Sequence, residues 1–359
     1  MRNEEVASGI PLRASVSVLI PTHGDAHLLA KSLPVFLRRS QENIEVLVMN
    51  NDPTQDVREA IGETANDPRL KLLEMGFEAG FARAINRGIR ESRGEFVMFC
   101  NADLFPSPSY LAEMIEFFAD HPMAGAATGK LLRFNLAADR PTDVIDTAGL
   151  ILARNRRVIA RGEGERDVGQ FERAEEVFGI DGAGLVARRS ALESIQVEGE
   201  YLDESFFMHK EDVDLSWRLR LARRECWYVP SAVAFHGRTT RGLGQRRYLT
   251  ALRTFHENEK QKTEAVRMHA MKNQWLMLIK NEDRYNLVRD LPFILAREGM
   301  VVGHNLLFSP RTLRAIPHVL TLVRKTLTKR RIIKGQQSVD PRTFRRWIQG
   351  GSGDAAGRS

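Results

Sequence analysis

The stretch FVMFCNAD, residues 96–103, is a run of uncharged, mostly bulky residues that ends on a carboxylate. Gly94 and Pro106 bound it, and a short apolar run between such residues is typical of a strand buried on both faces of a parallel sheet. In open α/β sheets, ligands bind beyond the carboxyl ends of the strands. We therefore expect Asp103 to lie where a ligand or a metal ion is bound.

Strands and helices alternate around this stretch. Apolar patterns predict strands at 16–20, 44–49 and 70–73, and helices at about 25–39, 57–64 and 81–91. Short connections between such elements imply βαβ units and a mostly parallel sheet, so the predicted fold class is α/β. Further along we expect a helix from Ser107 to about Asp120, a strand at 124–132, loops and short hairpins at 133–176, a helix that opens at Glu211, and a last strand at 227–235.

The length of 359 residues allows two domains, or one large domain with an appendage. Cys100 and Cys226 lie in apolar, strand-like stretches, which suits buried thiols better than a disulfide. The first residues include acids and precede no long apolar run, so we expect no secretory signal. No stretch of about 18 apolar residues predicts a membrane-spanning helix.

The charges divide the chain into two parts. Residues 1–240 contain 29 Lys and Arg against 37 Asp and Glu, whereas residues 241–359 contain 24 against 9. An acidic front and a strongly basic back suggest two separate tasks. Scattered basic residues usually form a solvated surface, but here they alternate with apolar residues at helical spacing.

The basic part is expected to form helices at about 246–257, 262–280, 284–298 and 310–331. Basic amphipathic helices of this kind bind anionic membrane surfaces. Three alternatives stay open: the apolar faces pack on the first part of the chain, they form a homodimer interface, or the basic side chains bind nucleic acid. We rank the membrane first, the dimer second and nucleic acid last, because no recognition motif accompanies the charges.

Two groups of acidic residues suit the transfer of a sugar from a nucleoside diphosphate. That reaction needs a divalent cation to neutralise the departing diphosphate and a base to deprotonate the acceptor hydroxyl. Asp103 could hold the cation, and the cluster of Glu211, Asp212 and Asp214 could supply the base. Acids at the start of a helix are more often caps, which is the alternative role of Asp212.

Six short motifs occur in order along residues 15–240. They are VLIPT at 18–22, Asn51, GFARAINRG at 80–88, NAD at 101–103, GAG at 182–184 and FMHKEDVDL at 207–215. In this order they resemble family 2 glycosyltransferases with a GT-A fold, particularly the bacterial rhamnosyltransferase-like branch. The resemblance implies a Rossmann-like, mostly parallel mixed sheet with flanking helices, followed here by a C-terminal helical region.

The resemblance implies a set of donor-binding residues: Pro21, Thr22, Asn50, Asn51, Gly80, Arg83, Asn86, Asn101 and Ala102. Asn50 stands where the family usually has an aspartate that accepts the imide proton of the base, and its amide carbonyl can still accept. Gly80, Arg83 and Asn86 would approach the ribose and diphosphate, with Arg83 a candidate phosphate contact. An arginine in an amphipathic helix is more often simply solvated.

The metal is implied to be Mg²⁺ or Mn²⁺, held by Asp103. The family usually has two aspartates that flank one residue, and Asn101 replaces the first of them, so Asn101 could instead bind the ribose or a metal-bound water. His236, at the end of the last strand, resembles a histidine that reaches the metal or diphosphate in several GT-A enzymes. A histidine that is only hydrogen-bonded at a strand end is the alternative.

The resemblance assigns the base to Asp212, with Glu211 and Asp214 beside it. A neighbouring carboxylate raises the pKa of one member of such a group, which helps it accept a proton at neutral pH. Attack from the opposite face of the sugar would invert the anomeric configuration. Gly182, Ala183 and Gly184, where the backbone can approach a ligand closely, are expected on the acceptor side with Asp214.

Together these features predict an inverting, metal-dependent glycosyltransferase, peripherally associated with the cytoplasmic face of the cell membrane. Its donor would be a nucleoside diphosphate sugar, with dTDP-rhamnose the first guess and a UDP-hexose the alternative, and its acceptor a lipid-linked or polysaccharide precursor. A non-catalytic nucleotide-sugar-binding or membrane scaffold protein is the second alternative. We expect an extension at 1–14, a catalytic domain at 15–243, basic amphipathic helices at 244–347 and a disordered tail at 348–359.

Overall fold

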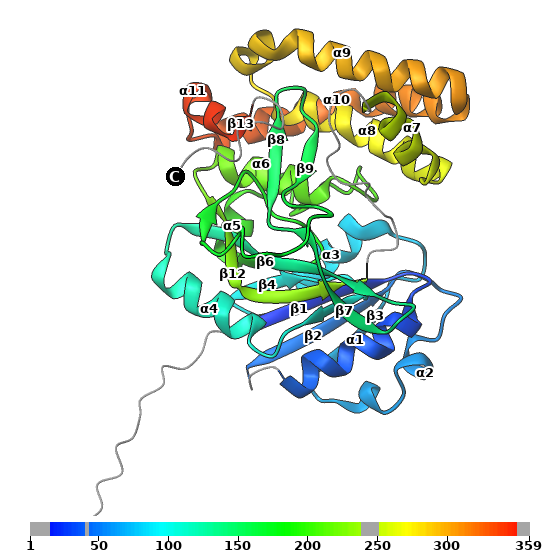
Figure 1. Cartoon of the computed structure of the whole chain (residues 1–359), viewed down its shortest axis with the longest axis vertical. Coiled ribbons are helices and arrows are strands. Elements are labelled where there is room, and N and C mark those ends of the chain that lie inside the picture. Colours follow the sequence, from blue (N-terminus) through cyan, green and yellow to red (C-terminus); the bar gives the residue numbers. More distant parts are fainter. Residues whose placement is uncertain (1–14, 40–42, 238–250, 350–359) are drawn as a thin grey trace, which may run out of the picture.

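The computed structural model describes residues 15–39, 43–237 and 251–349 (Figure 1). The expected extension at 1–14 and residues 350–359 of the expected tail lie outside these ranges, as does the boundary at 243 and 244.

Four parallel strands form the first half of the main sheet, in the order β3-β2-β1-β4. They are β1 (Val16–Thr22), β2 (Ile44–Asn50), β3 (Leu70–Glu74) and β4 (Phe96–Phe99). All four residues of β4 are buried. The apolar run at 96–99 is therefore the buried strand that its composition predicts, with parallel β1 on one side and an antiparallel strand on the other.

The second half of the sheet is mixed. The antiparallel strand β11 (Leu185–Arg188) joins β4 to β6 (Ala124–Asn135), and β12 (Glu225–His236) pairs parallel to β6. The stretch 133–176 forms the expected short strands and hairpins, namely β7 (Arg140–Thr147), β8 (Leu150–Ala153), β9 (Val158–Ala160) and β10 (Glu175–Glu176). The predicted α/β class with a mostly parallel mixed sheet is confirmed.

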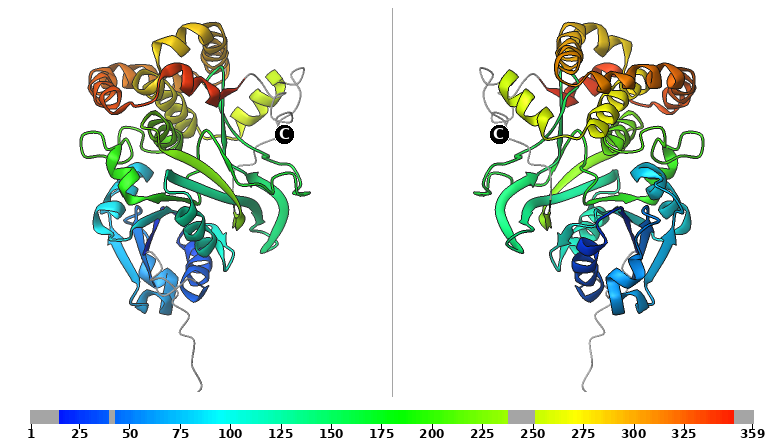
Figure 2. Two further views of the ribbon diagram at one scale, coloured as in Figure 1. Left: turned by 90° about the vertical axis from the view of Figure 1, so that its left-hand side faces the viewer. Right: turned by 90° about the vertical axis from the view of Figure 1, so that its right-hand side faces the viewer.

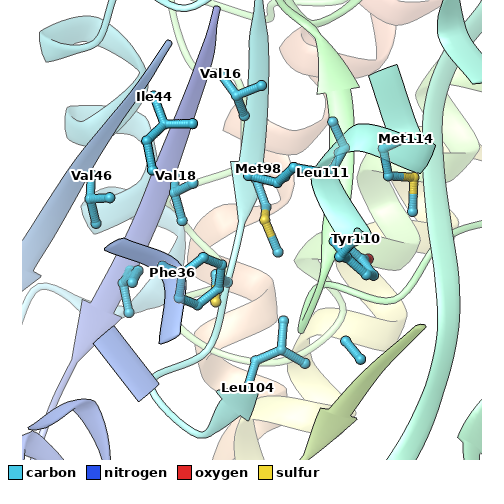
Figure 3. Close-up of a cluster of buried hydrophobic side chains, with 14 of the residues drawn as sticks. Val16, Val18, Phe36, Ile44, Val46, Met98, Leu104, Tyr110, Leu111 and Met114 are labelled. Atoms are coloured by element: carbon cyan, nitrogen blue, oxygen red, sulfur yellow. The ribbon is translucent and has the colours of Figure 1, made fainter. Parts of the chain in front are cut away.

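Helices cover both faces of the sheet (Figure 2). They are α1 (Ala26–Arg39), α2 (Val57–Ile61), α3 (Gly80–Glu91), α4 (Tyr110–Asp120), α5 (Arg189–Ser194) and α6 (Glu211–Leu221). Side chains alternate along each strand, so Val18 packs in a cluster with Phe36 of α1 and Tyr110 of α4, as Figure 3 shows. Leu19, on the opposite face, packs with Ile85 of α3.

The helix expected from Ser107 begins instead at Tyr110. The Ser107 amide donates to the Val233 carbonyl at 2.9 Å, because the preceding strand β5 (Leu104–Pro106) pairs with β12. With Ser107 as the cap, the first helical residue was expected at Pro108, so the pairing of β5 delays the helix by two residues, which the local Ser-Pro signal could not reveal.

The C-terminal part is helical, as expected. Its elements are α7 (Ala251–Lys260), α8 (Glu264–Asn281), α9 (Arg284–Phe308), the 3₁₀ turn η3 (Pro310–Arg314), α10 (Ala315–Gln336), α11 (Pro341–Phe344) and the short strand β13 (Ile348–Gln349). These helices gather above one end of the sheet (Figures 1 and 2). No helix in the described part of the chain is both long and apolar enough to cross a bilayer.

The apolar faces of α8 and α10 pack on the first part of the chain. Met277 of α8, Val319 of α10 and Phe344 of α11 share one buried cluster with Trp217 of α6. Ile348, which was expected in a disordered tail, is buried in the same cluster and pairs with Leu152 of β8. Packing on the first part of the chain, one of the three alternatives to membrane binding, therefore holds for these faces.

Some basic residues expected on a membrane-facing surface are buried instead. Lys329 of α10 and Lys280 of α8 both form ion pairs with Asp203, at 2.6 and 2.5 Å. Burial alone would raise the pKa of Asp203, but the two ammonium groups outweigh that effect and hold the pKa well below its usual range. Arg345 and Arg156 likewise share the buried carboxylate of Asp290.

Replacing Asp203 by Asn should lower the melting temperature and weaken its dependence on acid pH. The unfolded carboxyl titrates near pH 3.9 and the folded one lower, so the stabilisation is present above about pH 3.9 and is lost as the pH falls. Leaving two buried lysines without their shared partner should cost about 3–5 kcal/mol. Calorimetry at neutral pH and at about pH 2.5, below the unfolded pKa, measures both effects.

The control is Asp139→Asn, which breaks an ion pair with Lys31 whose side chains are 64% and 50% exposed. Exposed pairs contribute little, so this variant should melt close to the wild type. Equal melting temperatures for Asp203→Asn and Asp139→Asn would contradict a stabilising role of the buried cluster.

Candidate active site

A cleft of about 620 Å³ opens at the carboxyl ends of β1 and β4. The start of α3, the turn before β11, the start of α6 and the end of β12 complete its walls. The residues that line it are Pro21, Thr22, His23, Asp25, Leu28, Asn51, Glu78, Gly80, Phe81, Asn101, Ala102, Asp103, Asp181, Gly182, Ala183, Phe207, Met208, His209, Lys210, Glu211, Asp212 and His236. Twelve of the expected site residues therefore share one cavity.

On the β1 side, the cleft has a buried acceptor. The Asn51 amide donates to the Thr22 carbonyl at 2.9 Å, which ties the end of β2 to the end of β1. The Asn51 side chain is 4% exposed, and its Oδ1 has no hydrogen-bond partner among the residues that the structure describes. This buried carbonyl oxygen is therefore an unsatisfied acceptor in a residue that lines the cleft.

At the end of β4, Asp103 meets His236. The Gly237 amide donates to the Asp103 carbonyl at 2.9 Å, and His236 Nε2 lies 3.3 Å from Asp103 Oδ1 and 3.2 Å from Asn101 Nδ2. On the other side of the ring, Nδ1 lies 2.8 Å from Asp146 Oδ2. Burial would lower the pKa of His236, but its hydrogen bonds to the two carboxylates outweigh burial and raise it to about 10.

The pair Asp103 and His236 offers a carboxylate oxygen and an imidazole nitrogen to a divalent cation. Within the described ranges, no group of three or more His, Cys, Asp or Glu could hold a metal ion. Mg²⁺ often takes only one or two carboxylates from the protein and fills its other positions with water and substrate phosphates. The residues therefore fit a cation that is bound together with a diphosphate. Coordination by His236 would require it to release its proton.

Glu211 and Asp212 open α6 at the opposite wall. Asp212 Oδ2 accepts from the Gly182 amide at 3.2 Å, and Oδ1 accepts from the Val213 amide at 2.8 Å. Burial, reinforced by the charge of Asp181, raises the pKa of Asp212 to about 6. Burial and the charge of Asp212 raise the pKa of Glu211 to about 8. At pH 7, Asp212 is therefore ionised and Glu211 is protonated, and the two neighbours have different proton states.

Five expected site residues do not line the cleft. Asn50 Oδ1 accepts from the Asp52 amide, and its Nδ2 donates to Gln55 and Glu74. Arg83 pairs with Glu204, and buried Asn86 binds the backbone of Tyr201 and Leu202. The Gly184 carbonyl accepts from the Tyr110 hydroxyl, and Asp214 pairs with Arg218, Lys280 and Asn281 inside the protein. Each of these five residues is thus bonded to other residues of the chain, and Arg83 is the one whose side chain is exposed.

Several cleft residues were not among the expected ones. Asp25 accepts from the Thr22 hydroxyl and from the His23 amide, and Asp181 accepts from the Ala183 amide at 3.0 Å. Lys210 and His209 precede the acids of α6. The position of Asp25 just after the first strand and of Asp181 just before the glycines was a usable signal. The sequence carried no signal for Asp146, which orients His236.

Residues 17–195 match the family model described as Glycosyl transferase family 2. Over 225 residues the chain is 25% identical to poly-beta-1,6-N-acetyl-D-glucosamine synthase of Staphylococcus epidermidis, covering 61% of this chain and 49% of that protein. A 90-residue stretch is 34% identical to an uncharacterized glycosyltransferase of Rickettsia bellii, covering 25% of this chain and 13% of that protein. The chain thus spans about half the length of the synthase.

A solved structure has a similar fold. The crystal structure of GalNAc-T7 with UDP, GalNAc and Mn²⁺ superposes with a TM-score of 0.55 at 11% identity, covering 86% of this chain and 58% of that one. With the family match, this likeness identifies the fold as GT-A-like.

Gly80→Ala should destabilise the protein more than Gly76→Ala does. Both glycines have φ of +77°, a left-handed conformation that costs other residues about 1–2 kcal/mol. A Cβ at Gly76 would meet open space, whereas one at Gly80 would lie 2.5 Å from the Phe207 carbonyl oxygen. Both variants lose stability through the left-handed conformation, and only Gly80→Ala also clashes with the cleft wall, so calorimetry of the two separates these effects. Equal losses of stability in the two variants would show that the backbone at Phe207 can shift without cost.

Proposed function

We propose that this chain, whose residues 17–195 form a glycosyl transferase family 2 domain, moves a sugar from a nucleoside diphosphate donor to an acceptor hydroxyl with inversion. The observation that carries the proposal is that Asp103 and Asp212, 109 residues apart in the sequence, line one cleft from different walls. One carboxylate suits a cation at the departing diphosphate, and the other suits a base at the acceptor.

In this reaction the acceptor oxygen forms a bond to the anomeric carbon while the bond from that carbon to the diphosphate oxygen breaks. Asp212 takes the acceptor proton, and its pKa of about 6 leaves it ionised at pH 7 yet basic enough to share that proton in the transition state. Its two backbone hydrogen bonds, from Gly182 and Val213, fix the direction of the carboxylate. Glu211, protonated at the same pH, is left to donate a hydrogen bond to substrate.

A cation would balance the charge of the cleft. Its walls carry six acidic side chains, at positions 25, 78, 103, 181, 211 and 212, and those that are ionised would repel a diphosphate. Mn²⁺ or Mg²⁺ bound at Asp103 and His236 would supply the positive charge that the leaving diphosphate needs. Asp146 holds the His236 ring in place from behind, as carboxylates commonly do for ligand histidines.

For the nucleoside base, we propose Asn51 as the acceptor in place of Asn50. The Asn50 amide is engaged inside the protein, whereas Asn51 Oδ1 is buried at the cleft wall without a partner in the described chain. An amide carbonyl can accept the imide N–H of uracil or thymine. This choice favours a UDP or dTDP donor.

Two donor sugars are candidates. The resemblance to rhamnosyltransferases proposes dTDP-rhamnose, whereas the name of the Staphylococcus relative proposes an N-acetylglucosamine donor. Both are tested side by side, with a lipid-linked or polysaccharide precursor as the acceptor.

Asp212→Asn and Asp103→Ala should each lower the transfer rate by about 100-fold or more, because they remove the base and a cation ligand. The wild-type rate should require Mn²⁺ or Mg²⁺ and should fall tenfold per pH unit below about pH 6, where Asp212 becomes protonated. Release of nucleoside diphosphate from each donor measures the rate, and Asp120→Asn, at the exposed end of α4, is the control. If both cleft variants match the wild type, the enzymatic assignment is wrong and nucleotide-sugar binding without catalysis takes its place.

We also propose that the outer face of α9 rests on an anionic membrane surface. Val288, Leu295 and Leu306 are 72%, 60% and 62% exposed and recur at intervals that keep them on one side of the helix. Exposed Arg284 and Arg289 lie on the same helix, and Figure 1 shows α9 on the side of the C-terminal region away from the sheet. Apolar side chains with cations beside them suit a membrane interface, where each near-surface cation adds about 1 kcal/mol.

The chain should float with vesicles of phosphatidylglycerol and phosphatidylcholine at low salt, and less with phosphatidylcholine alone. The double variant Leu295→Ser and Leu306→Ser should lose most of this binding, because it removes the apolar contact. Val168→Ser is the matched control, since Val168 is 79% exposed but lies in the first part of the chain. If the chain does not float with the vesicles at low salt, the membrane proposal is rejected. If sedimentation shows that the wild type is a dimer and the double variant is not, this face belongs instead to the contact with a second copy.

A further inference from the structure

The cleft has one wall that the C-terminal helices hold in place. This wall is the segment 200–210, the last part of the connection from α5 to α6. It contributes Phe207, Met208, His209 and Lys210 to the cleft. It runs between α3 on one side and α8 and α10 on the other. Its last residue precedes the two acids assigned to the reaction.

The backbone of this wall is strained. Phe207, His209 and Lys210 have φ of 65°, 67° and 72°, a left-handed region that residues with a side chain seldom adopt. Such residues persist only where the surroundings hold them, and they concentrate at functional sites. The conformation of the wall therefore requires strong contacts from neighbouring elements.

On the α3 side, the contacts come from the start and the middle of the helix. The Phe81 amide donates to the Phe207 carbonyl at 2.7 Å, across the gap that Gly80 keeps free of a Cβ. One turn further, Asn86 accepts from the amides of Tyr201 and Leu202. These bonds fix both ends of the segment against the donor side of the cleft.

On the opposite side, one side chain of α8 binds three carbonyls of the wall. Asn273 Nδ2 lies 3.0 Å from the Phe206 oxygen and 2.7 Å from the oxygens of both Met208 and His209. The Asn273 side chain is fully buried. Its neighbour Lys272 donates to the Ser205 carbonyl at 2.5 Å. The Phe206 carbonyl also accepts from the Met208 amide at 2.8 Å. The carbonyls of Met208 and His209 are therefore the ones for which Asn273 is the donor.

The backbone of 206–210 is also bonded to the helix that carries the two proposed catalytic acids. The Lys210 carbonyl accepts from the Asp214 amide at 2.9 Å, the first hydrogen bond of α6. The position of residue 210 therefore sets the position of the first turn of α6, which carries Glu211 and Asp212 into the cleft.

We propose that Asn273 is a positioning residue: it holds the strained backbone of 206–210 and, through it, places Asp212 for catalysis. The kinetic part rests on the proposed sugar transfer, whereas the hold on the backbone does not. The C-terminal helical region thereby becomes a part of the active site as well as a candidate membrane contact.

Hydrogen–deuterium exchange of the whole chain tests the hold on the backbone. In Asn273→Ala, the amides of residues 203–212 should exchange about tenfold faster or more, because the carbonyls of Met208 and His209 lose this donor and the left-handed backbone loses its support. Gln274→Ala is the matched control: Gln274 is on the same helix and 1% exposed, but it donates to the Arg156 carbonyl. That control should leave exchange at 203–212 unchanged. Unchanged exchange in Asn273→Ala overturns the proposal.

Kinetics separate positioning from packing. Asn273→Ala should lower kcat by about 100-fold and change the donor KM little, because a shift of the base affects the chemical step more than binding of the nucleotide. The isosteric Asn273→Asp keeps the volume but removes the donor, so it should be impaired as much as the alanine variant. Wild-type kcat in Asn273→Asp, or in Asn273→Ala with accelerated exchange, overturns the positioning role.

The exchange experiment and the kinetic experiment can fail independently of each other. If the wild-type chain transfers no sugar, the proposed function is rejected, and accelerated exchange in Asn273→Ala still supports the hold of α8 on the wall.

Discussion

The fold of this chain depends on charge that is buried between its two parts. Asp203, in the first part of the chain, forms ion pairs with Lys280 of α8 and Lys329 of α10, and all three side chains are nearly inaccessible to water. A buried charge is tolerated only when it is paired, so these groups admit one arrangement of the helices over the sheet. The same helices bring Asn273 to the carbonyls of the cleft wall. Stability and the geometry of the site thus share one set of contacts.

This arrangement changes the meaning of the charge division. An acidic front and a basic back suggested two independent tasks, but part of the basic excess neutralises the acidic part internally, at Asp203 and Asp290. The remaining excess includes exposed basic side chains on α9 and α10, two helices that also carry exposed apolar side chains. The cleft keeps its own surplus of carboxylates, which fits a site that binds an anion together with a cation.

The sequence predicted the features that depend on local patterns. The apolar run at 96–99 is buried, Asp103 lies beyond it in the cleft, and the acids that open α6 reach the same cavity. Neighbours across the fold were harder to predict. Asn50 and Asn51 are adjacent, and only the register of the strand end decides which one faces the cleft.

The role of Asn273 was beyond sequence reasoning for a similar reason. It lies in a helix whose pattern indicates only an amphipathic surface, more than sixty residues after the carbonyls that it binds. Lys280 and Lys329 look like other lysines of a basic helix until their carboxylate partners are placed. Pairs that form through tertiary packing leave no periodic signal in a single sequence.

The central claim is that Asp103 and Asp212 serve one reaction from opposite walls of a single cleft. Crystals grown with Mn²⁺ and UDP or dTDP, with anomalous scattering recorded at the manganese edge, test it most directly. The account predicts a manganese peak at Asp103, with the diphosphate beside it and the open side of the cleft facing Asp212. A nucleotide bound outside this cleft, or manganese bound in the crystal away from Asp103, would contradict it.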